Sequence, residues 1–162
     1  MILPRYPLTT GLELQTFEFI SEGTKGRIPK LVLFTQTNLR DFYILSFGDK
    51  DKFTGDIDDK VISNNGDSEK VLATVIATIY AFTDKYQDAY IYATGSTKAR
   101  TRLYRMGISK YLSEGKRDFE IYGELKDGWD DFKKGIDYNG FFSFNKKSVI
   151  VNSFFKIVPA VF

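Results

Sequence analysis

The first third of the chain alternates short apolar segments with turn-type residues, and this alternation constrains the fold more than any other feature. Three segments rich in β-branched and aromatic residues, 12–21, 28–37 and 42–47, have the length of strands. Two polar connections of hairpin length, 22–26 and 38–41, separate them. The pattern predicts an antiparallel meander.

The rest of the chain mixes helical and strand patterns. Apolar residues recur at helical spacing between Glu69 and Lys85, and Asp67 or Ser68 is the expected cap. A second helix is expected at 98–114, with Thr97 as its cap and Gly107 as the point where it kinks or splits. Further strands are expected at 60–63, 89–94, 119–125 and 140–145. These patterns predict an α+β fold, with a largely antiparallel twisted sheet of about six or seven strands and two main helices packed on one face.

The length of 162 residues fits one α+β domain spanning 1–162. Residues 1–11 are interpreted as an N-terminal extension without a signal-peptide pattern. The apolar segment 148–162 is shorter than the roughly 20 residues of a membrane-spanning helix. It is interpreted as a buried closing strand, and a tail that docks on a membrane or a partner is the alternative. The expected location is the cytoplasm, without membrane association.

The composition removes many kinds of chemistry. The chain has no cysteine and no histidine, which excludes disulfides, thiol nucleophiles, Ser-His-Asp arrangements and most transition-metal sites. Neither the P-loop pattern nor the dinucleotide-binding pattern is present. We therefore expect a noncatalytic protein without a cofactor or a metal ion. The net charge of +2 gives no global attraction to nucleic acid.

One basic segment stands out, where a strand, a Gly-Ser-Thr turn and a helix follow one another over 92–105. The first N–H groups of such a helix lack intrahelical partners and the helix dipole is positive there, so the turn is suited to bind an anion. The predicted ligand-binding residues are Ser96, Thr97, Lys98, Arg100, Arg102, Tyr104 and Arg105.

The charges around this segment allow two interpretations. Residues 96–117 carry seven basic side chains and one acidic one, a local balance of +6, whereas 118–131 have a balance of −5. Helical spacing directs Arg100 away from the face of Lys98, Arg102 and Arg105, so partial burial beside aromatic rings and the turn is expected for it. In the first interpretation the basic helix face is solvated and Arg100 pairs with an acid. In the second, the turn and helix contact phosphates while tyrosines stack on bases. The acids considered are Asp118, Glu120 and Glu124, and the tyrosines are Tyr90, Tyr92, Tyr104 and Tyr111.

Two further patterns in the sequence are weaker. The Asp-rich segment 49–59 looks like a calcium loop but has Phe53 and Thr54 where the EF-hand pattern needs a ligand and a glycine, so a solvated loop is favoured. Asp118, Glu124 and Lys126 resemble the acid and E-x-K group of metal-dependent nucleases. Such short patterns are common by chance.

The run YATGSTKARTRLYRMGI resembles the most distinctive segment of a family of small uncharacterised proteins from Bacteroidetes-type bacteria. The resemblance covers roughly residues 12–147 and implies a compact bacterial domain without an assigned activity. The family pattern would match Gly95, Ser96, Thr97, Ala99, Arg100, Leu103 and Tyr104. A looser, fold-level similarity links the meander-then-helix order to Whirly- and PC4-like single-stranded DNA-binding domains. The chain departs from that order because one strand, and not four, separates its two helices.

These observations lead to a functional hypothesis with two alternatives. The hypothesis is a noncatalytic domain that binds single-stranded nucleic acid or another phosphate ligand through Ser96–Arg105. The first alternative is a protein-interaction component of toxin–antitoxin or defence type, in which the basic helix meets an acidic protein partner or the chain forms a homodimer. The second is the metal-dependent nuclease.

Overall fold

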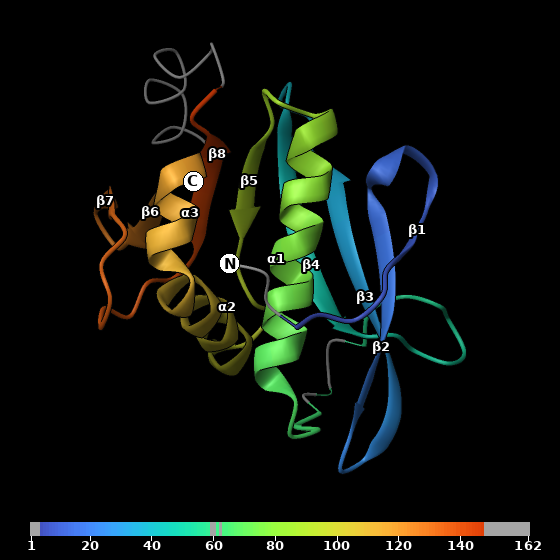
Figure 1. Ribbon diagram of the computed structural model, residues 1–162. Helices are drawn as coiled ribbons and strands as arrows, with labels where there is room; N and C mark the ends of the chain where they lie inside the picture. The colour runs from blue at the N-terminus through green and yellow to red at the C-terminus, as the bar shows by residue number, and fades with distance from the viewer. Residues whose placement is uncertain (1–3, 59–60, 62, 148–162) are drawn as a thin grey trace.

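A computed structural model describes residues 4–58, 61 and 63–147 of the chain (Figure 1). Over these residues it contains eight strands, three α-helices and one 3-10 turn, η1 (Leu12–Leu14). The helices are α1 (Ser68–Lys85), α2 (Lys98–Lys110) and α3 (Leu112–Asp118). The strands are β1 (Thr9–Thr10), β2 (Thr16–Gly23), β3 (Gly26–Gln36), β4 (Phe42–Asp49), β5 (Tyr90–Ala93), β6 (Phe119–Leu125), β7 (Gly128–Asp131) and β8 (Phe141–Asn145).

The strands form one mixed sheet in the order β1-β2-β3-β4-β5-β8-β6-β7. The predicted meander is present, because β2, β3 and β4 pair antiparallel in sequence order. Between β2 and β3 the turn is only two residues long and is closed by Gly26, whose φ is 90°. Strands β4 and β5 pair parallel because α1 carries the chain back across the sheet between them. All other neighbouring strands in the described sheet pair antiparallel.

The helices cover one face of the sheet, and the main core lies between them and that face (Figure 1). Helix α1 buries Val71, Val75 and Phe82, which follow the predicted helical spacing. The ring of Phe82 stacks on Phe34 of β3 at a centroid distance of 4.1 Å. A second, aromatic cluster, made by the alternate side chains of the central strands, lies on the opposite face; its buried members are Phe42, Tyr90, Tyr92, Phe142 and Phe144.

The architecture confirms the α+β class and the largely antiparallel sheet, but it corrects the element counts. The described sheet has eight strands instead of six or seven, and there are three helices instead of two. The helical run 98–114 does break, but at Tyr111 and not at Gly107. Gly107 stays helical because Leu72 packs against it: a Cβ there would lie 3.0 Å from Leu72 Cδ2.

Two boundaries in the first part of the chain also differ from the prediction. The strand expected from residue 12 begins at Thr16, because Glu13 and Leu14 have φ values of 63° and 54° within η1. Val61 and Ser63, expected in a short strand, lie outside any strand.

The structure describes most of the N-terminal segment but not the C-terminal one. In the segment 1–11, Tyr6 is buried against the core and its N–H donates to Thr74 Oγ1 at 2.9 Å. The closing strand expected at 148–162 lies outside the described residues. None of the helices in the described part of the chain is long and apolar enough to cross a membrane.

Candidate functional site

The site lies at one edge of the sheet, where the parallel strands β4 and β5 end. Their register pairs Phe42 with Tyr90 and Leu45 with Ala93, so both strands run toward the same edge. The chain leaves β4 into the loop that leads to α1, and it leaves β5 into the turn that leads to α2. Both helices therefore begin at this edge (Figure 1). The carboxyl ends of parallel strands are a common place for ligand sites.

The Gly-Ser-Thr turn locks the start of α2 by short-range contacts. A Cβ on Gly95 would lie 2.4 Å from the Thr101 backbone nitrogen, so only glycine fits. The Gly95 N–H donates to Thr101 Oγ1 at 3.0 Å. Thr97 is the helix cap, as predicted: its Oγ1 accepts a hydrogen bond from the Arg100 N–H at 3.2 Å. Because this cap serves Arg100, the N–H groups of Lys98 and Ala99, the first two of α2, remain without an intrahelical acceptor.

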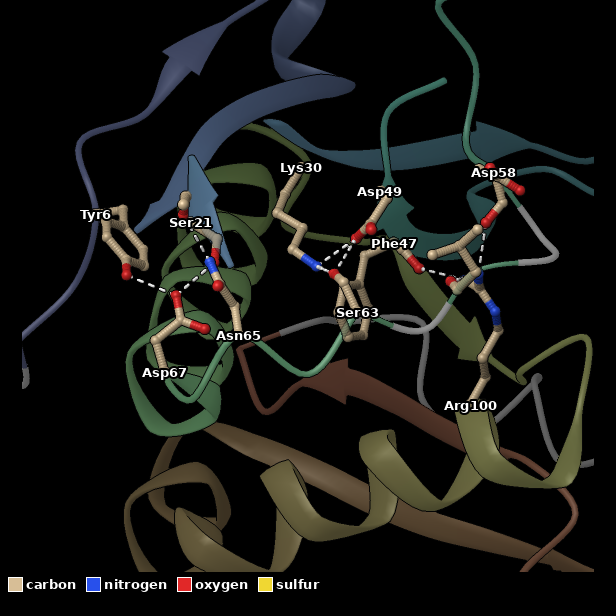
Figure 2. A network of polar contacts seen from close by, with 12 residues as sticks. Tyr6, Ser21, Lys30, Phe47, Asp49, Asp58, Ser63, Asn65, Asp67 and Arg100 are labelled. Carbon is tan, nitrogen blue, oxygen red and sulfur yellow. Dashed lines mark hydrogen bonds and ion pairs between the residues drawn. The ribbon is translucent and has the colours of Figure 1, made fainter. Parts of the chain in front are cut away.

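Arg100 links α2 to the rest of the edge (Figure 2). Its side chain is buried, with 6% of the residue exposed. The guanidinium donates to three backbone oxygens, at 3.3 Å to Phe47, 2.5 Å to Asp58 and 2.7 Å to Val61. Its Nε is buried and has no hydrogen-bond partner within the described part of the chain.

This geometry has two consequences for the predictions about Arg100. The burial of Arg100 that the helical spacing indicated is confirmed. The expected ion pair is wrong, because the guanidinium binds main-chain carbonyls and not Asp118, Glu120 or Glu124. Gly48 leaves room for the guanidinium, since a Cβ there would lie 2.6 Å from Arg100 Nη1.

The remaining predicted site residues divide into exposed and engaged side chains. Ser96, Thr97, Lys98 and Arg102 are exposed. No salt bridge in the described residues involves Lys98 or Arg102. Tyr104 is buried, and its hydroxyl accepts the Phe47 N–H at 3.2 Å. Arg105 donates to Asp137 and is half-buried.

Several basic side chains of α2 and α3 form ion pairs within the protein. Lys110 pairs with Glu69 and Lys116 with Asp131, at 3.6 Å for the latter. Together with the Arg105 pair, these contacts connect α2 and α3 to neighbouring elements. The basic face that the sequence indicated is therefore reduced, beside the Gly-Ser-Thr turn, to Lys98 and Arg102.

A pocket of about 220 Å³, here called the α2 pocket, opens beside the turn. Its wall includes Ser46 of β4, Thr94, Gly95 and Ser96 of the turn, and Arg100 and Tyr104 of α2. No acidic side chain is among the described residues that line it. A pocket with one arginine, hydroxyl groups, a helix start and no carboxylate is electrostatically suited to an anion.

A second pocket, here called the polar pocket, lies on the other side of Arg100 and has a volume of about 270 Å³. Lys30, Asp49, Ser63, Asn65 and Asp67 line it, together with apolar side chains of α1 and α2. Lys30 is buried; its Nζ donates to Asp49 and, at 2.8 Å, to Ser63 Oγ (Figure 2). The carboxylate of Asp49 compensates the buried charge of Lys30.

The start of α1 closes the far end of the polar pocket. Asp67 precedes the helix but makes no side-chain cap bond to it. Its Oδ2 instead accepts hydrogen bonds from Tyr6 at 2.6 Å and Ser21 at 2.5 Å. Asn65 Nδ2 donates to Ser21 Oγ at 3.0 Å, which extends the network to β2 (Figure 2). Burial, and then the hydrogen bond to Asp67, raises the pKa of Tyr6.

Sequence reasoning missed both groups of contacts in the polar pocket, that of Lys30 with Asp49 and Ser63 and that of Asn65 with Ser21. One signal for the first group was present: Lys30 is the only charged residue in the run 28–37, and the other residues of 28–34 are all apolar. A charge in such a run needs a buried partner. The partners come from β4 and the following loop, and no local pattern connects those segments to Lys30.

The residues of the nuclease hypothesis are not brought together. Asp118 precedes β6 and accepts a hydrogen bond from Tyr80 at 2.7 Å. Glu124, near the other end of β6, accepts one from Tyr92 at 3.1 Å. Six residues of extended strand separate the two by about 20 Å. The described residues contain no group of three or more acidic side chains that could hold a metal ion.

In the Asp-rich loop, the Asp51 side chain forms a turn. Its Oδ1 accepts the N–H groups of Phe53 at 2.7 Å and Thr54 at 3.0 Å. The hydrogen bonds from Thr54 and then Phe53 lower the pKa of Asp51. The carboxylate oxygen is thus used to shape the loop.

The fold and the edge site define an α+β protein whose helices α1 and α2 begin beside the same parallel strand pair. The chain matches the model of the Family of unknown function (DUF6934) over residues 3–146, and it belongs to that family. No curated protein and no solved structure shows a significant match to it.

Proposed function

We propose that this protein binds a phosphate group of its ligand in the α2 pocket and performs no chemistry on it. The observation that carries the proposal is the α2 pocket, whose described lining contains no acid and has the buried Arg100 in its wall. A phosphate oxygen there can accept the N–H groups of Lys98 and Ala99 and the hydroxyl of Ser96. The Nε of Arg100 has no hydrogen-bond partner in the described part of the chain. Because the guanidinium is already buried, its positive charge attracts the phosphate without a further desolvation cost for the arginine.

The surroundings of the pocket favour a ligand that continues into solvent. Lys98 and Arg102 are exposed beside the turn and form no salt bridge in the described part of the chain. They suit the neighbouring phosphates of a single-stranded nucleic acid. Tyr90, Tyr92, Tyr104 and Tyr111 are all buried, which supports contact with phosphates instead of stacking on bases. Binding should therefore depend strongly on salt and weakly on sequence.

Residues of the Gly-Ser-Thr…Ala-Arg…Leu-Tyr pattern have structural roles that favour it as the signature of the family. Gly95 fits only without a side chain, Thr97 caps α2, and Arg100 and Tyr104 both attach α2 to β4. We infer that this pattern is the signature of the family, with Ser96 as its ligand-contacting member.

Fluorescence anisotropy with labelled single-stranded DNA and RNA at low ionic strength tests the proposal. The site variant is Ser96→Ala/Lys98→Ala/Arg102→Ala. The matched control is Ser113→Ala/Arg117→Ala/Lys134→Ala, which removes the same residue types from exposed positions elsewhere. We expect the site variant to bind at least about tenfold more weakly than the control variant. Equal losses in the two variants, or no binding by the wild type, would reject the proposal.

A protein-interaction role is the second candidate, and one observation favours it. Phe53 is 99% exposed at the tip of the turn that Asp51 shapes, where it is presented as an apolar anchor. This role includes the homodimer and the toxin–antitoxin or defence component. Light scattering on the wild type and Phe53→Ser decides whether Phe53 supports self-association; two identical monomeric profiles would reject the homodimer.

A further inference from the structure

A third pocket lies between α1 on one side and α2 and α3 on the other, and it shares Phe47 and Tyr104 with the α2 pocket. Its volume is about 130 Å³. Its floor is the helix-covered face of the sheet, formed by Leu45, Ile91 and Phe141. Its walls include Ile76 and Ile79 of α1 and Ile108 of α2. We call it the apolar pocket.

The lining of the apolar pocket is aliphatic, aromatic or glycine except for Glu114 and Ser143. The hydroxyls of its three tyrosines are already engaged. Tyr80 donates to Asp118 at 2.7 Å, Tyr104 accepts from Phe47 at 3.2 Å, and Tyr111 donates to the Glu69 carbonyl at 3.5 Å. A water molecule needs two to four polar partners, so such a space favours an apolar occupant.

The apolar pocket exists because α2 packs loosely against the rest of the protein. The buried residues of α2 are Arg100, Tyr104 and Gly107, so polar contacts near its start hold it and no broad apolar stripe does. Gly107 and, on α3, Gly115 contribute no side chain where the helices face the pocket. The half-buried isoleucines at 76, 79 and 108 lie where the pocket reaches the surface.

We propose that the apolar pocket binds a small uncharged apolar molecule, of the size of a benzene ring or a short branched aliphatic chain. The volume sets the size, since dry apolar cavities of about 150 Å³ take up benzene. The lining sets the chemistry. Glu114 is the one charged residue in the described lining, and its negative charge disfavours a ligand that ends in a carboxylate, such as a fatty acid. This proposal does not rest on the phosphate proposal, because the two ligands differ in chemistry and the described linings share only Phe47 and Tyr104.

A toluene titration of the full chain tests the proposal. The readout is methyl NMR of Ile76, Ile79 and Ile108, which line the pocket. Saturable shifts of these methyl groups are expected. In Ile108→Phe the new ring fills the pocket, so toluene affinity should fall by at least about tenfold. Leu103→Phe is the matched control, since Leu103 is a half-buried residue of α2 outside the apolar pocket, and it should bind toluene like the wild type.

Three results would overturn the proposal: no saturable shift up to the solubility of toluene, shifts spread evenly over the isoleucines of the whole chain, or unchanged binding by a folded Ile108→Phe. If Ile108→Phe does not fold, Ile76→Phe applies the same test from the α1 side of the pocket.

Discussion

Helices α1 and α2 begin at the same sheet edge, but their first turns are built in opposite ways. At α1, the carboxylate of Asp67 lies beside the positive end of the helix, and Tyr6 and Ser21 hold it there. The first turn of α1 also contains Glu69. At α2, the neutral Thr97 caps the helix, and the first turn contains no acid.

This difference indicates what each helix start can do. The dipole of α1 is compensated by a carboxylate that belongs to the protein, so this helix start stabilises the fold. Among the described residues no carboxylate caps α2 in this way, and Lys98 adds charge of the same sign as the helix start. A bound anion would compensate the positive charge at the start of α2. The predictions below test this contrast, starting with the largest expected effect.

Arg100 and Arg102 separate the structural role of α2 from its binding role. Arg100→Met should reduce the free energy of unfolding by about 3 kcal/mol, because three carbonyls lose a charged donor. Arg102→Met should change it by less than about 0.5 kcal/mol, because that side chain is exposed. Urea unfolding measures both. Equal values for the two variants would mean that Arg100 does not anchor the helix.

Asp67 and Thr97 compare the two helix starts directly. Asp67→Ala leaves the hydroxyls of Tyr6 and Ser21 without their shared acceptor and should cost about 2 kcal/mol. Thr97→Ala removes one cap bond and should cost about 1 kcal/mol. Thermal unfolding of the two variants gives the order. A larger loss for Thr97→Ala would contradict the view that α1 has the more heavily engaged start.

Tyr6 makes the α1 start sensitive to alkaline pH. Burial and Asp67 raise its pKa above the ordinary value of 10.0. The neutral phenol therefore stabilises the fold fully below pH 10, and that contribution is lost as the pH rises through the raised pKa. Tyr6→Phe should lose less stability than the wild type over this range, although it starts lower by about 1 kcal/mol.

The measurement is the free energy of unfolding as a function of pH, from neutral to above pH 10. The pKa values of Tyr43, Tyr80, Tyr92 and Tyr122 are also raised, and for Tyr92 to about 12. Tyr6→Phe is therefore expected to reduce the alkaline loss without abolishing it. Parallel curves for the two proteins would show that the pKa of Tyr6 is the same in the folded and unfolded states, which would contradict the raised pKa.

Several parts of this account could be read from the sequence because they depend on local patterns. The strand at 119–125 and the helix at 69–85 follow from periodicity, and the structure has them at Phe119–Leu125 and Ser68–Lys85. The cap at Thr97 and the burial of Arg100 follow from turn chemistry and helical spacing.

Other features could not be predicted because they join distant segments. The acceptors of Arg100 are backbone oxygens, which leave no mark in the residue types, and they lie 39 to 53 positions away. The helix break at Tyr111 was expected at Gly107, because a pattern along one helix does not reveal that Leu72 packs there. The ion pair of Arg105 with Asp137 also joins segments that are far apart in the sequence.

Titration of the ¹⁵N-labelled protein with inorganic phosphate tests the central contrast most directly. We expect saturable shifts of the Lys98 and Ala99 amides, at the start of α2. The Ser68 and Glu69 amides, at the start of α1, should not move. Equal shifts at both helix starts, or none at α2, would contradict the assignment of the phosphate site.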